Sequence, residues 1–88
     1  MSRWALEVSE EFERAIRKLD RHVTRRILAG LEEIADSEDP RSRGRALTGA
    51  LGGLWRYRFG DYRVLVQVED ARLVIIAITA GHRSTVYR

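Results

Sequence analysis

The chain of 88 residues contains no cysteine, one proline and two histidines. Without cysteine it has no disulfide and no thiolate nucleophile, which leaves His22 and His82 as the only strong metal ligands. No stretch approaches the roughly 20 apolar residues of a membrane helix, and the charged start lacks the apolar segment of a signal peptide. We therefore expect one cytoplasmic domain over residues 1–88, with no membrane, metal or cofactor.

Lysine is also nearly absent, since 15 of the 16 basic residues are arginine. The net charge of +3 is unevenly spread: residues 1–39 carry 7 basic and 10 acidic side chains, and residues 40–88 carry 9 and 3. Arginine binds phosphate through a planar fork of donors. The second half therefore has the charge pattern of a surface that binds a polyanion, although a GC-rich genome would also favour arginine over lysine.

The first half predicts one short strand and two helices. Residues 4–8 alternate apolar and polar side chains, as a strand with one buried face does. Ser9 and Asp20 are suitable N-cap residues, and apolar residues recur at helical spacing after each of them. The second stripe ends near Ser37, so we expect two antiparallel helices joined near residue 20.

Residues 37–53 hold the only proline and four of the seven glycines, which predicts a long loop. This loop carries Arg41, Arg43 and Arg45. From residue 54 the apolar period changes to two, which predicts three strands, over residues 54–59, 62–69 and 72–80. The order β-α-α-β-β-β indicates an α+β fold, in which a two-helix hairpin packs on one face of a small, mainly antiparallel four-stranded sheet.

Two-residue turns at Gly60-Asp61 and Asp70-Ala71 would set the register of these strands. The aromatic and aliphatic side chains then share the face that meets the helices, and Arg58 lies directly opposite Arg63 on the other face. Like charges in that position are destabilising, so their presence favours an anion-binding site over an ordinary solvated face. In this register Ile78 also lies opposite Arg63, and the C-terminal tail begins beside the arginines. The predicted cluster comprises Arg56, Arg58, Arg63, His82, Arg83 and Tyr87.

Four segments in order resemble the RelE/ParE superfamily of bacterial and archaeal toxins, namely residues 45–49, 53–58, 60–64 and 81–83, followed by Tyr87. The resemblance spans essentially the whole chain. It implies the toxin of a type II toxin–antitoxin module, neutralised by a RelB-like or similar antitoxin that wraps around it. RelE-like members cut mRNA in the ribosomal A site, whereas ParE-like members inhibit DNA gyrase without cutting RNA.

The basic pattern of the cluster looks closer to the RelE branch, whose chemistry is attack of an mRNA 2′-OH on the adjacent phosphate. By this resemblance Arg63 and Arg83 stabilise charge on the phosphate, and Tyr87 orients or stacks on a nucleotide. Well-studied RelE-like toxins have lysines on the strand that here carries Arg56 and Arg58, and one of those lysines is a proposed base. Arginine is a poor base, so His82 is the alternative proton carrier.

Three further sets of contacts are expected with the partners, which are the ribosome, its mRNA and the antitoxin. The loop arginines Arg41, Arg43 and Arg45 are expected to bind RNA. The second helix carries Arg25 and Arg26 on a basic ridge that would either grip RNA or form a solvated face. An apolar patch on the open sheet face is expected to bind the antitoxin, through Leu65, Val74, Ile76 and Ile78. A gyrase inhibitor, or a degenerate toxin that only binds its antitoxin, remains the alternative.

Overall fold

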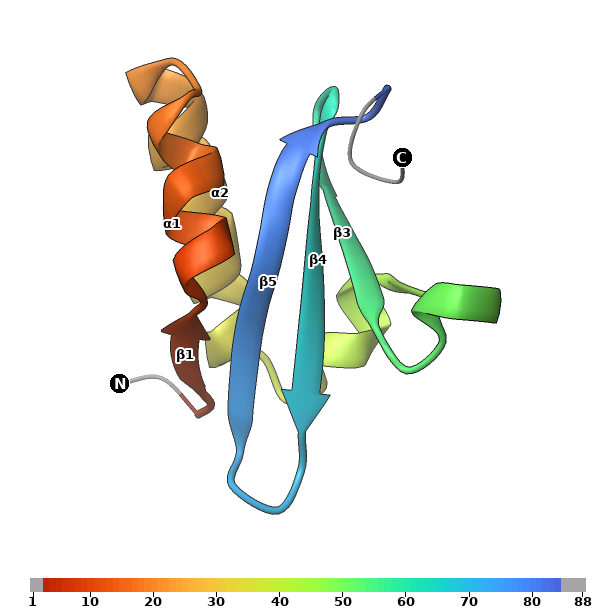
Figure 1. The fold of residues 1–88 in the computed structure, drawn as a ribbon. Coiled ribbons are helices and arrows are strands. Elements are labelled where there is room, and N and C mark those ends of the chain that lie inside the picture. Colours follow the sequence, from red (N-terminus) through yellow and green to blue (C-terminus); the bar gives the residue numbers. More distant parts are fainter. Residues whose placement is uncertain (1–2, 85–88) are drawn as a thin grey trace.

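Two helices cover one face of a five-stranded sheet and leave the other face open (Figure 1). A computed structural model describes residues 3–84 of the chain. Its main elements are β1 (Ala5–Val8), α1 (Glu10–Arg17), α2 (Arg21–Asp36), β2 (Arg45–Ala46), β3 (Trp55–Phe59), β4 (Tyr62–Glu69) and β5 (Val74–His82). Two short 3₁₀ helices, η1 (Pro40–Arg43) and η2 (Gly49–Leu51), flank β2.

The sheet has the order β1-β5-β4-β3-β2, with β1 parallel to β5 and the other pairs antiparallel. This confirms the α+β fold and the two-helix hairpin on one face. The expectation of four strands is wrong, because Arg45 and Ala46 pair with Arg56 and Trp55 and add an edge strand. Two residues are too few to show a strand period, so this segment has the sequence of a loop.

The first helix begins as its cap predicts. The hydroxyl of Ser9 accepts a hydrogen bond from the amide of Phe12 (3.0 Å), and it donates one to the carbonyl of Ile78 on β5 (2.6 Å). Asp20 stands at the N-cap position of α2 but makes no capping hydrogen bond. Instead, the hydroxyl of Thr24 donates to the carbonyl of Ile16 (3.0 Å) and joins the two helices.

The core lies between the helices and the sheet and contains the side chains that both apolar stripes predict. It includes residues that are fully or almost fully removed from solvent, namely Phe12, Ile27, Leu31, Ile34, Tyr57, Val64, Val66, Ile75 and Ala77. Trp4 joins this cluster, and Trp55 is partly buried against it. Burial of this apolar surface is the main driving force that holds the helix pair on the sheet.

The turn between β3 and β4 has the predicted register. Phe59 pairs with Tyr62 and Arg58 pairs with Arg63. Gly60 adopts a left-handed φ of 62°, a conformation that two-residue hairpin turns require and that glycine adopts without strain. The face assignment of β3 and β4 therefore follows from the sequence.

The turn between β4 and β5 is wider than predicted. Glu69 pairs with Val74, so the connection has four residues, 70–73, and a bulge at Leu65/Val66 shifts the register again. As a result Gly81, and not Ile78, lies opposite Arg63, and Ala80 joins the core. Asp70-Ala71 contains no glycine or asparagine for the left-handed positions of a tight turn, which explains why the wider loop forms.

Tyr57 ties the segment after α2 to the sheet. Its side chain is only 1% exposed, and its hydroxyl donates to the carbonyl of Pro40 in η1 (2.8 Å). Burial raises the pKa of Tyr57 from 10.0 to about 12, because a buried phenolate would lose its hydration.

We expect Ser9→Ala to lower the free energy of unfolding by roughly 1–2 kcal/mol, because it removes a helix cap and a link to β5. Urea unfolding followed by circular dichroism measures this. Ser42→Ala is the matched control, since the exposed hydroxyl of Ser42 bonds only to the nearby carbonyl of Asp39 (2.8 Å). Its effect should stay within about 0.5 kcal/mol. Equal effects of the two substitutions would contradict the role given to Ser9.

A second prediction concerns alkaline pH. Because the pKa of Tyr57 is raised in the folded chain, its contribution to stability is complete below pH 10 and is lost as the pH rises toward 12. The loss amounts to roughly 2–3 kcal/mol over that interval. Tyr57→Phe should be less stable at pH 7, by about 1–3 kcal/mol for the unpaired carbonyl, and should show a flatter decline between pH 9 and 11. Parallel urea titrations measure both, and an unchanged decline would contradict the assignment.

Candidate functional site

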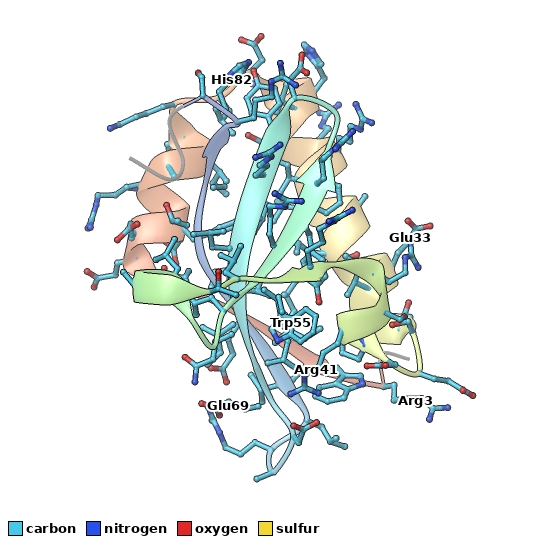
Figure 2. All side chains as sticks on the ribbon, turned by 90° about the vertical axis from the view of Figure 1, so that its right-hand side faces the viewer. Arg3, Glu33, Arg41, Trp55, Glu69 and His82 are labelled. Carbon is cyan, nitrogen blue, oxygen red and sulfur yellow. The ribbon has the colours of Figure 1, made fainter. Side chains whose placement is uncertain are left out.

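The open face of the sheet carries a concentration of arginine side chains. Tyr57 points into the core, so its neighbours Arg56 and Arg58 project to the opposite face. The cross-strand partners share that face: Arg45 lies opposite Arg56, and Arg63 lies opposite Arg58. Figure 2 looks onto this face, where nitrogen-rich side chains gather over β3 and β4. Three predicted catalytic arginines, Arg56, Arg58 and Arg63, therefore come together with one loop arginine, Arg45.

A groove of about 280 Å³ lies between the η1–β2 segment and β3. Its lining residues are Ser42, Arg43, Gly44, Arg45, Arg56 and Arg58; we call it the arginine groove. No acidic side chain lines it. Four guanidinium groups around an open groove could bind phosphate groups, which arginine holds through two donors at once.

The η1–β2 segment lies so close to β3 that position 44 requires glycine. A Cβ atom on Gly44 would lie 2.7 Å from the carbonyl oxygen of Arg56 and 2.7 Å from the ring of Tyr57. The sequence predicts that Arg43 and Arg45 bind RNA, but it does not predict that their segment packs against β3 and forms one wall of the groove. The alternation Arg41-Ser42-Arg43-Gly44-Arg45 was the only local signal, because side chains of one sign recur there at strand spacing.

Arg41 has a different setting from the other loop arginines. Its guanidinium makes two hydrogen bonds to the carboxylate of Asp70 (2.9 and 2.7 Å) and one to the carbonyl of Val68 (3.3 Å), and it lies 5.9 Å from the centre of the Trp55 ring (Figure 2). The hydrogen bond lowers the pKa of the Asp70 carboxyl and raises the pKa of Arg41. Arg41, which is predicted to contact RNA, therefore already binds Asp70 and Val68 and holds η1 to the β4–β5 connection.

The C-terminal members of the predicted cluster are divided between the two faces. The amide of Arg83 donates to the carbonyl of Asp61 (2.8 Å), which holds Arg83 at the turn beside the Arg58–Arg63 pair. His82 pairs with Tyr62, on the face that meets the helices, and their rings make an edge contact at 5.6 Å. In the described part of the chain the ring contact of His82 is thus with Tyr62, on the face opposite the Arg58–Arg63 pair. Tyr87 lies outside the described residues.

His82 is held by local hydrogen bonds as well. Its Nδ1 accepts a hydrogen bond from the amide of Ser84 (3.2 Å) and lies 2.9 Å from the Ser84 hydroxyl. Acceptance at Nδ1 leaves Nε2 as the protonated nitrogen of the neutral ring. The ring is exposed at the end of the sheet.

The predicted apolar patch is smaller than expected. Leu65 is 3% exposed and Val74 is 5% exposed, whereas Ile76 and Ile78 are partly exposed. Of these four residues, only Ile76 and Ile78 offer apolar surface to a partner.

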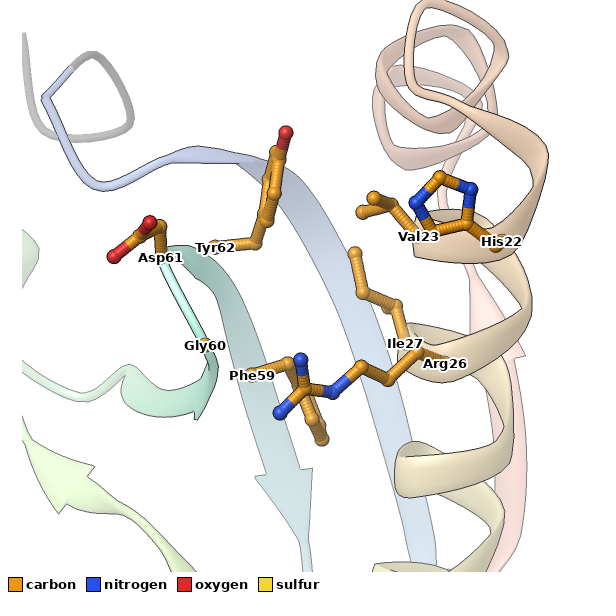
Figure 3. A pocket seen from close by; sticks show the side chains of 8 residues that line it. All are labelled: His22, Val23, Arg26, Ile27, Phe59, Gly60, Asp61 and Tyr62. Atoms are coloured by element: carbon orange, nitrogen blue, oxygen red, sulfur yellow. The ribbon is translucent and has the colours of Figure 1, made fainter.

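The basic ridge of α2 lies apart from the arginine groove. Arg25 is exposed, and Arg26 reaches over the β3–β4 turn, where its Nη1 would lie 3.0 Å from a Cβ atom on Gly60. Figure 3 shows Arg26 at the rim of a second pocket, of about 280 Å³, with Phe59 and Tyr62 on the sheet side. This pocket is on the helix side of the turn.

Within residues 3–84, no group of three or more histidine, cysteine, aspartate or glutamate side chains is arranged to hold a metal ion. No helix of that region is long and apolar enough to cross a membrane. The described site therefore consists of arginines and the backbone that presents them.

Comparison with known proteins identifies the family of this chain. The profile of the family described as ParE toxin of type II toxin–antitoxin system, parDE, matches residues 6–87. Toxin RelG of Mycobacterium tuberculosis is 33% identical over 66 residues, which cover 72% of this chain and 76% of that protein.

Two solved toxin–antitoxin complexes contain the same fold. The RelBE2 complex of Mycobacterium tuberculosis matches with a TM-score of 0.73 and 28% identity, over 96% of this chain and 95% of that one. The RelE–RelB complex of Pyrococcus horikoshii matches with a TM-score of 0.73 and 26% identity, over 97% and 99%. The chain belongs to the RelE/ParE superfamily and is the toxin of a type II toxin–antitoxin system.

Proposed function

We propose that this toxin is a ribosome-dependent endoribonuclease that cleaves mRNA in the A site and thereby inhibits translation. One observation carries the proposal: the arginine groove and the Arg58–Arg63 pair lie on the same open face, with no acidic side chain lining the groove. A folded protein tolerates such like-charge crowding at a cost, and a polyanionic strand would relieve it. Similarity to toxin RelG supports the RelE-like reading.

The proposed reaction is attack of an mRNA 2′-oxygen on the adjacent phosphorus. The new O2′–P bond forms as the P–O5′ bond breaks, which gives a 2′,3′-cyclic phosphate and a 5′-OH end; the 2′-OH proton leaves and O5′ gains one. Negative charge grows on the phosphoryl oxygens in the transition state. Arg63, Arg58 and Arg83 stabilise that charge, while Arg43, Arg45 and Arg56 hold flanking phosphates.

Arginine remains protonated at any working pH, so it supplies charge and not proton transfer. His82 lies on the Tyr62 side of the sheet, and the substrate would have to pass around the Gly60-Asp61 turn to reach it. We therefore assign the described arginines to charge stabilisation and treat His82 and Tyr87 as the candidates for proton transfer.

The toxin is proposed to have a RelB-like antitoxin as its partner, because the solved relatives from Mycobacterium tuberculosis and Pyrococcus horikoshii are toxin–antitoxin complexes. An antitoxin has two ways to inhibit the site. It can occupy the arginine groove with acidic side chains, or it can cover the apolar surface at Ile76 and Ile78. Both would block access of mRNA to the open face.

Gyrase inhibition without nuclease activity is the second candidate. It is favoured by the absence of any histidine or carboxylate from the lining of the arginine groove, since cleavage needs a proton acceptor. A basic surface of this kind would then bind a protein or DNA partner.

We expect Arg63→Ala to lower the rate of A-site cleavage by about 10²–10³-fold, the usual effect of removing one charge-stabilising donor. Primer extension on mRNA bound to purified ribosomes measures this by the positions and yields of new 5′ ends. Arg72→Ala is the matched control, because Arg72 pairs with Glu69 (2.6 Å) at the other end of β4. It should cleave like the parent.

The same preparations separate the two candidates. The nuclease proposal expects new 5′ ends at the A site and normal supercoiling by DNA gyrase in the presence of the toxin. Intact mRNA together with impaired supercoiling would establish the second candidate and overturn the first.

A further inference from the structure

The arginine groove joins two parts of the chain that electrostatics would separate. Arg43 and Arg45 come from the η1–β2 segment, and Arg56 and Arg58 come from β3. Four like charges around one groove repel each other, and the segment pairs with β3 through only two residues, Arg45 and Ala46. Some other interaction must hold it.

That interaction is centred on Tyr57, which lies between Arg56 and Arg58 in the sequence but points to the other face. Its hydroxyl donates to the carbonyl of Pro40, the first residue of η1, at 2.8 Å and within the core. A buried hydrogen bond of this kind is costly to lose, because the carbonyl would stay without a partner.

The ring of Tyr57 supplies a second contact with the same segment. The backbone at Gly44 rests so near to it that a Cβ atom would lie 2.7 Å from the ring. On the outer side, Arg41 holds η1 to Asp70 through two hydrogen bonds. Pro40, Arg41 and Gly44 are therefore fixed, and Arg43 and Arg45 are the immediate chain neighbours of Gly44.

We propose that Tyr57 is a positioning residue for RNA binding, which holds Arg43 and Arg45 against Arg56 and Arg58 so that the groove is formed before RNA arrives. The inference rests on the proposed function, since it takes the ligand of the groove to be an RNA backbone. Such preorganisation means that RNA binding does not have to supply the free energy needed to bring the four cations together.

The salt dependence of RNA affinity tests this directly. For single-stranded RNA, log K falls with log salt by about 0.7 for each phosphate neutralised. Binding of a short single-stranded RNA, measured by fluorescence anisotropy at several salt concentrations, should give Tyr57→Phe a slope shallower than that of the parent by about 1.4, which corresponds to two lost arginine contacts. Arg43→Ala with Arg45→Ala should give the same change, and adding Tyr57→Phe to that pair should change nothing more.

Two further variants separate positioning from stability. Ile75→Val truncates a fully buried side chain of β5, a strand that pairs with β1 and β4 and not with β2. It lowers stability, but its salt slope should equal that of the parent. Gly44→Ala places a Cβ atom against both the Arg56 carbonyl oxygen and the Tyr57 ring, so it should push the segment away from β3 and reproduce the shallower slope, even if Tyr57→Phe does not fold. Identical slopes in the parent, Tyr57→Phe and Gly44→Ala would overturn the proposal.

Amide hydrogen exchange gives a readout that needs no RNA. The amides of Gly44 and Leu47 donate to Arg41 and Leu54, and in Tyr57→Phe they should exchange about tenfold faster relative to core amides such as that of Val64. In Ile75→Val the ratio should not change. An unchanged ratio in Tyr57→Phe would also overturn the proposal. Failure of the parent to bind or cut RNA would count against the proposed function. The exchange ratio would still decide whether Tyr57 holds the η1–β2 segment against β3.

Discussion

The tight turn at Gly60-Asp61 is the constraint on which the rest of the molecule depends. A one-residue change of register between β3 and β4 would move every side chain of β3 to the other face of the sheet relative to those of β4. With the turn in place, Tyr57 and Val64 enter the core while Arg58 and Arg63 meet on the open face. The apolar core and the charged site are thus two consequences of one backbone conformation, which glycine at position 60 permits with a φ of 62°.

The second feature of the molecule is that its charged site is built on rigid structure. Arg56, Arg58 and Arg63 stand on adjacent strands, and Arg43 and Arg45 stand on a segment held by the Tyr57–Pro40 hydrogen bond and the Arg41–Asp70 pair. Surface ion pairs alone contribute little to stability. Here the Arg41–Asp70 pair acts by position. It holds the outer side of the η1–β2 segment, whose inner side is held by the buried Tyr57.

Much of the fold could be predicted from periodicity and caps. The Ser9 cap, the two amphipathic helices, the β3–β4 hairpin and the Arg58–Arg63 pairing are local features, and each is set by residues within a few positions of each other. The misplaced features depend on distant partners. Asp70 is held by Arg41, 29 positions away in the chain, in a wider turn than Asp70-Ala71 predicts. The bulge in β4–β5 then decides which residue lies beside Arg63, and no local pattern marks it.

The site likewise combines features set by local sequence with features set by contacts between distant residues. The arginines of β3 and β4 can be placed on one face from the sequence, since side chains alternate along a strand and the turn fixes their pairing. Which other cations join them depends on the folded chain. The tertiary structure adds Arg43 and Arg45, engages Arg41 elsewhere, and places His82 beside Tyr62 on the opposite face. The physical reason is that alternation is a property of each strand, whereas the approach of a loop or the offset of a neighbouring strand depends on contacts between residues far apart in the chain.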